Sequence, residues 1–495
     1  METLAARTTL GARTGAAYLE GLRDAREVWI RGERARDVTT HPGLARGAAT
    51  MAALLDRQHD AELRDLLTVA GENGSRYATS FLRPTTADDL RRRSAAMYDW
   101  AIQSGGMLGR TGDYLNSSLM AFAAAADFFA AVRPEFGDNV RRYYHHARDH
   151  DLVLTHTLVN PQVNRRLTAA GAPSPEVALH TVERNARGIV VRGARLLATL
   201  GPLSDEIVVF PSTILKNDPS SAPYALAFAL PNATPGMRFV CRDSYDEGKS
   251  VFDAPLSARF EEMDAIVLFD DVLVPWERIF LADDMPACND VFAATSAVVH
   301  LMHQVACKNL AKAEFLVGLL CAMTRASERD ELPQVQGMVA EAMWTAETMR
   351  ALLRTAEAEA APDRWGTMTP SRTPLDTARN LFPRLYPRLV ELVQLLGSSS
   401  LMATPCEADF ANELAGDVQR YLQLAHADAS DRVALFRLAQ DVAASGFGAR
   451  QVLYERFFFG PPEMLAATYY RTYEKEPLVG RVHDLLARTH GDSTA

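Results

Sequence analysis

The spacing of apolar residues divides the chain into three stretches, and the first has the periodicity of helices. In segments 15–30, 41–63 and 86–102, apolar residues recur every three or four positions. This spacing gathers apolar side chains on one helical face, so it predicts a mainly helical stretch from about residue 15 to 150. Thr86, with two acidic residues in the turn that follows, is a typical helix N-cap.

Near His150 the pattern changes to short apolar runs that are rich in β-branched residues. Turns containing Gly, Pro, Asn and Asp separate these runs. Strands this close together leave no room for crossover helices, so the pattern predicts an antiparallel sheet or barrel. The runs are LVLTHTLV (152–159), GIVVRGARLLATL (188–200), EIVVFPSTIL (206–215), YALAFALP (224–231), MRFVCRDSY (237–245) and DAIVLFDDVLVP (264–275).

After Pro275 the chain returns to long segments of helical periodicity. Several are long enough, with enough apolar positions, to be members of a four-helix bundle. The order helical, β, helical predicts an α+β fold. We predict an N-terminal helical domain at 1–150, a central β domain at 151–280 and a C-terminal helical bundle domain at 281–495.

Composition narrows the class of protein. With 495 residues, 48% hydrophobic and 23% charged, the chain has the composition of a soluble globular protein, and its length suggests about two to four domains. A formal net charge of −10 argues against nucleic-acid binding, and basic residues interspersed with acids form no membrane-binding patch. Five cysteines without a CxxC indicate neither a disulfide framework nor a zinc knuckle. The start lacks a secretory signal pattern and the longest apolar stretch is too short to span a bilayer, so we expect a cytoplasmic protein.

Common enzyme motifs are missing from the sequence. No G-x-G-x-x-G follows a strand, and neither the phosphate-loop motif nor the G-x-S-x-G nucleophile motif occurs. A redox reaction on this chain therefore has no evident nicotinamide site of its own.

Two histidine groups could hold a metal ion. His146 and His150 share one face of a helix, and His300, His303 and Cys307 share a face of another. Polar helix ends and partly buried helix faces commonly carry such residues for structural reasons. We therefore predict no metal site.

The clearest candidates for chemistry are Arg110, Tyr114 and His156. GRTGDY puts the guanidinium and the phenol one helical turn apart, where the segment either caps a helix or lines a pocket. His156 lies in a β-type run and leads into NPQVNR (160–165), a polar turn with amides and a second guanidinium. These residue types favour a surface for a polar, planar ligand.

Four segments then carry a resemblance to a known family. GRTGDYLN (109–116), THTLVNPQVNR (155–165), FDAPLSARFEEMDAIVLFDDVLVPWERIF (252–280) and SGFGARQVLYE (445–455) are similar, in this order, to the large oxygenase component of 4-hydroxyphenylacetate 3-hydroxylase. That family includes chlorophenol monooxygenases and hydroxylases of phenolic natural products. The resemblance implies an acyl-CoA-dehydrogenase-like fold with an N-terminal helical domain, a central antiparallel β-barrel and a C-terminal four-helix bundle.

The resemblance also implies a two-component flavin monooxygenase. A separate NAD(P)H-dependent flavin reductase makes FADH2, which diffuses to this protein and reacts with O2 to give a C4a-hydroperoxyflavin. The terminal oxygen is transferred to the carbon ortho to the hydroxyl of a small phenolic substrate. The family further implies a homotetramer with flavin sites near subunit boundaries.

The resemblance assigns roles to individual residues. His156, as a neutral imidazole, takes the phenolic proton, Arg110 steadies the phenolate, and Tyr114 donates a further hydrogen bond. Ser212 and Thr213 match the positions that contact the far end of the substrate, with turn capping as the alternative. The positions that match the flavin site are His156, Thr157, Leu158, Gln162, Val163, Asn164, Arg165, Thr199, Ser445, Gly446, Phe447 and Gly448. Glycines would let the backbone approach the flavin closely, and a helix C-cap is the alternative explanation of SGFG.

Other functions stay open at this stage. The substrate is a free phenolic acid such as 4-hydroxyphenylacetate, a halogenated or nitro phenol, or a phenol tethered to a carrier protein or built into a natural product. A remote alternative is a lyase similar to 4-hydroxybutyryl-CoA dehydratase, since His300 and Cys307 resemble half of its iron–sulfur motif. Residues 95–109 contain no cysteine for the other half. A non-catalytic scaffold would have lost the polar triad, which this chain keeps.

Overall fold

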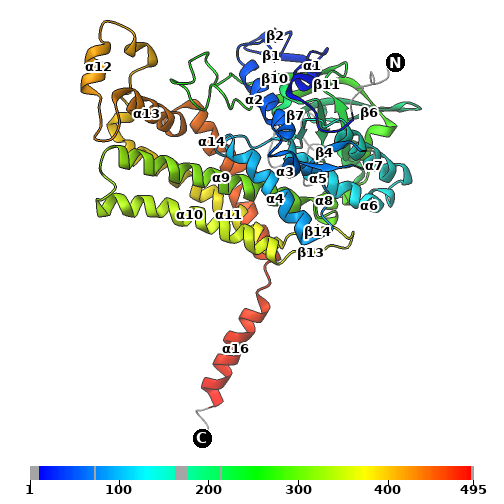
Figure 1. The fold of residues 1–495 in the computed structure, drawn as a ribbon. Helices are drawn as coiled ribbons and strands as arrows, with labels where there is room; N and C mark the ends of the chain where they lie inside the picture. Colours follow the sequence, from blue (N-terminus) through cyan, green and yellow to red (C-terminus); the bar gives the residue numbers. More distant parts are fainter. Residues whose placement is uncertain (1–9, 72–73, 162–174, 212–214, 492–495) are drawn as a thin grey trace.

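The computed structural model describes residues 10–71, 74–161, 175–211 and 215–491. Strands gather in one part of the molecule, and the long helices α9, α10 and α11 lie beside one another in the other part (Figure 1). The mixed α/β fold confirms the predicted class in its coarse form. The predicted boundaries at residues 150 and 280 stay a prediction.

The N-terminal stretch is mainly helical, as the periodicity predicts. Thr86 caps α4 in a capping box with Asp89, because each side chain bonds the other's backbone amide. The helices are α1 (Gly15–Gly21), α2 (Ala45–Asp56), α3 (Arg64–Leu67), α4 (Ala87–Ile102), α5 (Gly112–Ala124), α6 (Ala126–Ala130) and α7 (Pro134–Asp149).

One predicted helix is wrong at its C-terminal end. The segment EVWI forms β1 (Glu27–Ile30), which turns through Arg31 and Gly32, both at positive φ, into β2 (Glu33–Ala35). Val28 and Ile30 are buried while the residues between them are only half-buried, so this short run follows a period of two. A second short hairpin, β3 (Thr68–Ala70) with β4 (Arg76–Ala78), also lies within the helical stretch.

All six predicted strands are present, but they do not form the predicted antiparallel barrel. The described residues form a six-stranded sheet in the order β2-β1-β10-β11-β7-β6 and a four-stranded sheet in the order β12-β9-β8-β5. The pairs β1–β10 and β5–β8 are parallel, and neither sheet closes on itself within the described residues. The strands are β5 (Leu154–Thr157), β6 (His180–Asn185), β7 (Gly188–Thr199), β8 (Glu206–Val209), β9 (Leu226–Pro231), β10 (Met237–Cys241), β11 (Asp264–Pro275) and β12 (Ile279–Ala282).

The physical reason for the mixed pairing is that the edge of the central sheet is covered by the distant hairpin β1–β2. Edge strands present unpaired backbone groups, and the hairpin satisfies those of β10. The spacing between successive strands of the central stretch could not predict this pairing, because β1 lies about 200 residues before β10 in the sequence.

Helix α9 (Ala297–Ala326) is the centre of the C-terminal part. Its buried residues lie all round the helix, because it packs against α10 and α11 and also against α4 and α5. Helix α5, which carries Tyr114, is thereby fixed between α9 and the strands. The other helices are α8 (Met285–Ala294), α10 (Pro333–Ala358), α11 (Arg372–Gly397), α12 (Ala415–Tyr421), α13 (Ala429–Ala443), α14 (Gly446–Phe457), α15 (Pro462–Thr472) and α16 (Glu476–Gly491), with a minimal hairpin of β13 (Ala361–Pro362) and β14 (Met368–Thr369).

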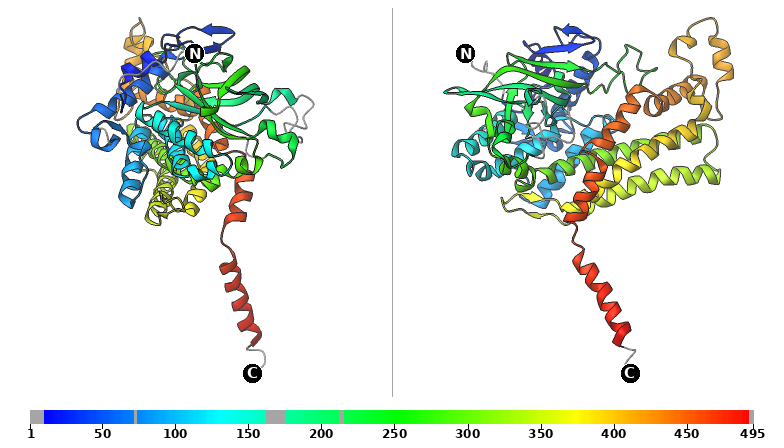
Figure 2. Two further views of the ribbon diagram at one scale, coloured as in Figure 1. Left: turned by 90° about the vertical axis from the view of Figure 1, so that its right-hand side faces the viewer. Right: turned by 180° about the vertical axis from the view of Figure 1, so that it is seen from behind.

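Helix α16 stands apart from the rest of the molecule. All views show it projecting away from the body, close to the C-terminal end (Figures 1 and 2). Leu478, Val482 and Leu485 on this helix are exposed. Across the part of the chain with described coordinates, no helix has both the length and the apolar character needed to cross a membrane.

Candidate active site

The turn before α5 holds Arg110 by its backbone. The amides of Gly109 and Arg110 both donate to Oε1 of Glu262, at 2.9 and 2.5 Å. Glu262 is 1% exposed, and its other oxygen accepts from Nη1 of Arg450 on α14 at 3.1 Å. Two amides bound to one buried carboxylate fix the direction in which the Arg110 side chain leaves the turn.

The guanidinium of Arg110 lies between aromatic rings. Its Cζ is 4.2 Å from the ring centroid of Tyr114 and 4.1 Å from that of Phe458. Arg110 is 8% exposed, and its Nη1 has no hydrogen-bond partner among the described residues. Burial lowers the pKa of Arg110, but Tyr454, Tyr114 and Glu262 outweigh it and raise the pKa above the ordinary value. The site therefore holds a charged guanidinium with a free donor.

His156 lies on β5 directly beside this group. Its ring stacks on Tyr114 with centroids 5.6 Å apart and packs against Phe210 at 5.4 Å. Burial, and then the charge of Arg110, hold its pKa well below the ordinary value. The imidazole is therefore neutral at physiological pH, and within the described residues its buried Nδ1 has no partner.

Tyr114 joins the other two residues. It lies in the first turn of α5, and burial raises the pKa of its phenol although the Arg110 guanidinium opposes the shift. The segment GRTGDY thus begins a helix, and that it also lines a ligand site stays a prediction. A neutral acceptor, a cation and a neutral phenol now stand together around aromatic surfaces, which suits a planar ligand that carries an oxygen.

Thr157, Leu158 and Thr199 form the strand framework next to His156. The hydroxyl of Thr157 donates to the carbonyl of Leu196 at 2.9 Å, and that of Thr199 donates to Asp264 at 2.6 Å. The carbonyl of Leu158 accepts from Arg195 at 2.7 Å. These bonds stabilise the sheet, so any ligand contact would come in addition to them. The predicted residues Gln162, Val163, Asn164, Arg165, Ser212 and Thr213 lie outside the described residues.

Ser445, Gly446, Phe447 and Gly448 begin α14. Ser445 is the N-cap, with its hydroxyl accepting from the amide of Gly448 at 3.0 Å, so the alternative of a C-cap is wrong. A Cβ on Gly448 would lie 2.1 Å from the carbonyl oxygen of Val442, which explains the glycine by close packing of α13 and α14. A contact of this segment with flavin stays a prediction.

The two histidine groups are bonded within the protein. His146 contacts Glu206 at 3.3 Å, and its backbone carbonyl accepts from His150. His300 contacts the guanidinium of Arg93 at 3.0 Å, and this cation would repel a metal ion at the same position. No cluster of three or more potential metal-ligating side chains is present in the described ranges.

Sequence reasoning missed Glu262, Arg450, Tyr454 and Phe458. Arg450, Tyr454 and Phe458 recur every four residues from the segment that begins α14, so one face of that helix points to the site. That periodicity was a usable signal. The sequence around Glu262 contains no such signal, because the role of a buried carboxylate depends on the residues that surround it in the fold.

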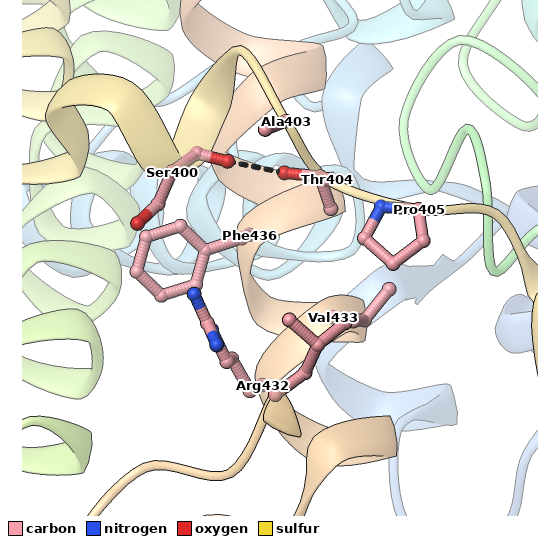
Figure 3. A pocket seen from close by; sticks show the side chains of 8 residues that line it. Ser400, Ala403, Thr404, Pro405, Arg432, Val433 and Phe436 are labelled. Atoms are coloured by element: carbon pink, nitrogen blue, oxygen red, sulfur yellow. Dashed lines mark hydrogen bonds between the residues drawn. The ribbon is translucent and has the colours of Figure 1, made fainter. Parts of the chain in front are cut away.

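Two hollows in the structure lie elsewhere. The first, of about 10 Å³, is lined by residues that include Ser400, Thr404 and Phe436, and it has room for about one water molecule (Figure 3). The second, of about 500 Å³, lies between α11 and α15 and is lined partly by Tyr469, Tyr470 and Tyr473. Neither includes the three candidate residues.

The chain is similar to known proteins along nearly its whole length. Residues 14–281 match the family model described as 4-hydroxyphenylacetate 3-hydroxylase N terminal, and residues 288–487 match the C-terminal model. The 4-hydroxyphenylacetate 3-monooxygenase oxygenase components of Geobacillus sp. (strain PA-9) and Thermus thermophilus are each 48% identical, and each alignment covers 96% of this chain and 96–97% of the relative. A crystal structure of the HpaB oxygenase component complexed with FAD and 4-hydroxyphenylacetate has a TM-score of 0.93 and 48% identity, covering 97% of this chain and 99% of that chain.

The class is therefore that of flavin-dependent aromatic monooxygenases with a mixed α/β fold. The chain belongs to the 4-hydroxyphenylacetate 3-hydroxylase family. An archaeal 4-hydroxybutyryl-CoA dehydratase shares the fold at a TM-score of 0.84 and 16% identity, which is a likeness of fold alone. In this chain the pair that prompted the lyase alternative is bonded to Arg93, through His300, and to Ser94, through Cys307.

Proposed function

We propose that this protein is the oxygenase component of a two-component monooxygenase that hydroxylates 4-hydroxyphenylacetate, or a closely similar phenol, ortho to its hydroxyl group. The observation that carries the proposal is the convergence of Arg110, Tyr114 and His156 in a chain 48% identical to oxygenase components over nearly its whole length. Two buried polar atoms of this group, Nη1 of Arg110 and Nδ1 of His156, have no partner among the described residues.

The residues suit activation of a phenol. A free phenol has a pKa of about 10, so forming the phenolate at pH 7 costs about 4 kcal/mol. Hydrogen bonds to a charged group such as the phenolate contribute about 1.5–3 kcal/mol each. Arg110 and Tyr114 as donors would offset most of that cost.

His156 accepts the phenolic proton in this proposal. Beside Arg110 alone the imidazole is a weak base, because burial and the neighbouring charge both oppose its protonation. A phenolate held between the two side chains cancels much of the repulsion between Arg110 and protonated His156. Transfer of the proton to His156 and formation of the phenolate therefore occur together. An electron-rich ring results, with its ortho carbon activated.

Reduced FAD, when bound, reacts with O2 and supplies the oxygen atom that is inserted. The residues we propose to hold it are His156, Thr157, Leu158, Gln162, Val163, Asn164, Arg165, Thr199, Ser445, Gly446, Phe447 and Gly448. Two features support this: in the sequence β5 leads from His156 into the polar turn, and α14 begins at Ser445, where the backbone amides of a helix N-terminus favour an anionic or oxygen-rich group. Ser212 and Thr213 are proposed for the far end of the substrate.

We also propose a separate flavin reductase as partner and a homotetramer as the assembly. Helix α16 supports self-association, since Leu478, Val479, Val482 and Leu485 form one apolar face that is exposed in the single chain. An isolated helix of this length is marginal in water, so its face needs a partner. A second copy of this chain is the partner we propose. The cytoplasmic location stays a prediction.

The direct test supplies the purified chain with FADH2 from any flavin reductase, O2 and 4-hydroxyphenylacetate, and identifies the product by mass spectrometry. We expect 3,4-dihydroxyphenylacetate. A panel with 4-nitrophenol, chlorophenols and an aminoacyl-tethered phenol runs in parallel. Free release of hydrogen peroxide without hydroxylation of any member would overturn the proposal.

A further inference from the structure

Tyr454 on α14 is a half-buried residue whose hydroxyl group is buried. Its hydroxyl is inaccessible to solvent and makes no hydrogen bond to any described residue. Its ring centroid lies 5.8 Å from Cζ of Arg110, 4.5 Å from Cζ of Arg450 and 5.0 Å from the ring of Phe458. Buried tyrosine hydroxyls are normally hydrogen-bonded, so this one calls for an acceptor that no described residue provides.

The position of Tyr454 within the site distinguishes it from His156. In order of contact, the rings run from His156 through Tyr114 and Phe458 to Tyr454, with Arg110 touching the last three. His156 and Tyr454 are therefore the two ends of this series of ring contacts, with Tyr114 and Phe458 between them. If the phenol binds at the His156 end, the Tyr454 end is left for the second ligand.

Helix α14 connects that end to the proposed flavin segment. The helix begins at Ser445 and carries Arg450, which bonds Glu262 and Asp264, before it reaches Tyr454. One rigid element thus links the first flavin-contact candidates to the hydroxyl. Rotation or shift of α14 would move both together.

Gly109 makes room for the hydroxyl. A Cβ built on Gly109 would lie 2.0 Å from Oη of Tyr454 and 2.4 Å from its Cζ. Any other residue at 109 would push the phenol out of its place. The first glycine of GRTGDY is thereby explained by Tyr454, which lies more than 300 positions further along the chain.

We propose that Tyr454 is a flavin-binding residue whose hydroxyl donates a hydrogen bond to an oxygen or nitrogen acceptor of bound FAD. This inference rests on the proposed function. Burial raises the pKa of Tyr454 well above the ordinary value, so the group is a neutral donor throughout the working pH range. The flavin atom that accepts this hydrogen bond can therefore be uncharged.

The test compares Tyr454→Phe with Tyr386→Phe. Tyr386 on α11 is fully buried and, like Tyr454, has a buried hydroxyl that bonds no described residue, but its ring packs on Phe382 and Lys312. FAD reduced under anaerobic conditions is titrated into each flavin-free protein and followed by protein fluorescence. A second titration uses 4-hydroxyphenylacetate, and melting temperatures confirm that both variants fold.

We expect Tyr454→Phe to weaken FADH2 binding about threefold to tenfold, with unchanged affinity for 4-hydroxyphenylacetate and no effect of Tyr386→Phe on either. Unchanged FADH2 affinity in Tyr454→Phe overturns the inference, since a water molecule would then satisfy the hydroxyl. A loss of phenol affinity alone overturns it too, because the hydroxyl would serve the substrate. Both results leave the proposed function intact, whereas wild-type protein that binds no FADH2 refutes both.

Discussion

The carboxylate of Glu262 offers the sharpest test of how the site is held. Glu262→Gln keeps the size of the side chain and removes its charge. Three hydrogen bonds are affected, from the amides of Gly109 and Arg110 and from Arg450. A hydrogen bond to a charged group contributes about 1.5–3 kcal/mol and a neutral one about 0.5–1.5, so the loss is about 1 kcal/mol for each bond.

The expected destabilisation is therefore about 2–3 kcal/mol. At about 2 cal/mol/K per residue, the unfolding entropy of a 495-residue chain is about 1 kcal/mol/K, so the apparent Tm should fall by only about 2–3 °C. The functional effect is larger in proportion, because the Arg110 turn loosens. We expect the Kd of 4-hydroxyphenylacetate to rise about fivefold and peroxide release to increase relative to hydroxylation.

Glu261→Gln is the matched control. Glu261 is equally buried and also accepts a backbone amide, that of Tyr245, and an arginine, Arg242, but it does not bond the turn before α5. The assays are differential scanning fluorimetry, phenol titration and the ratio of product to peroxide. If both variants raise the Kd of the phenol equally, or Glu262→Gln leaves it unchanged, the carboxylate does not position Arg110.

Four other predictions follow from the same contacts. His156→Ala should lower hydroxylation about a hundredfold or more while FADH2 oxidation continues, measured as product against oxygen consumed, and an equal loss of both would contradict its role as base. Arg110→Ala should weaken phenol binding about tenfold to a hundredfold in an equilibrium titration, since it removes a charge-assisted donor, and wild-type affinity would take it out of the site. Burial raises the pKa of Asp113 from 3.8 to about 6. Its protonated form therefore contributes about 3 kcal/mol of stability below about pH 4, and this contribution is lost as the pH rises through 6. In urea unfolding at pH 4.5 and pH 7, Asp113→Asn should reduce the difference in stability between the two pH values, and an unchanged difference would refute the assignment. Deleting residues 476–495 should reduce the assembly size in light scattering, and an unchanged mass would separate α16 from self-association.

Local interactions were predictable from the sequence. The capping box at Thr86, the six β-branched runs and the long helices depend on neighbours within a few residues, so their patterns could be recognised directly. The pair Arg110 and Tyr114 also belongs here, because four residues of separation already place them together. His156 was a candidate because it lies in a β-type run that leads into a polar turn, and the family resemblance then gave it a role.

Contacts between distant segments were decided only by the tertiary structure. The hairpin β1–β2 became part of the central sheet because an edge strand of that sheet needed a partner, which overrode a helical periodicity. The clamp of Glu262 and Arg450 and the approach of Tyr454 to Gly109 join segments more than 150 residues apart. The sequence determined which local elements form and which polar groups are at hand. The packing of α5, α9, α14 and β5 determined which of those groups meet, because burial, pKa and unpaired donors arise from surroundings that linear order does not encode.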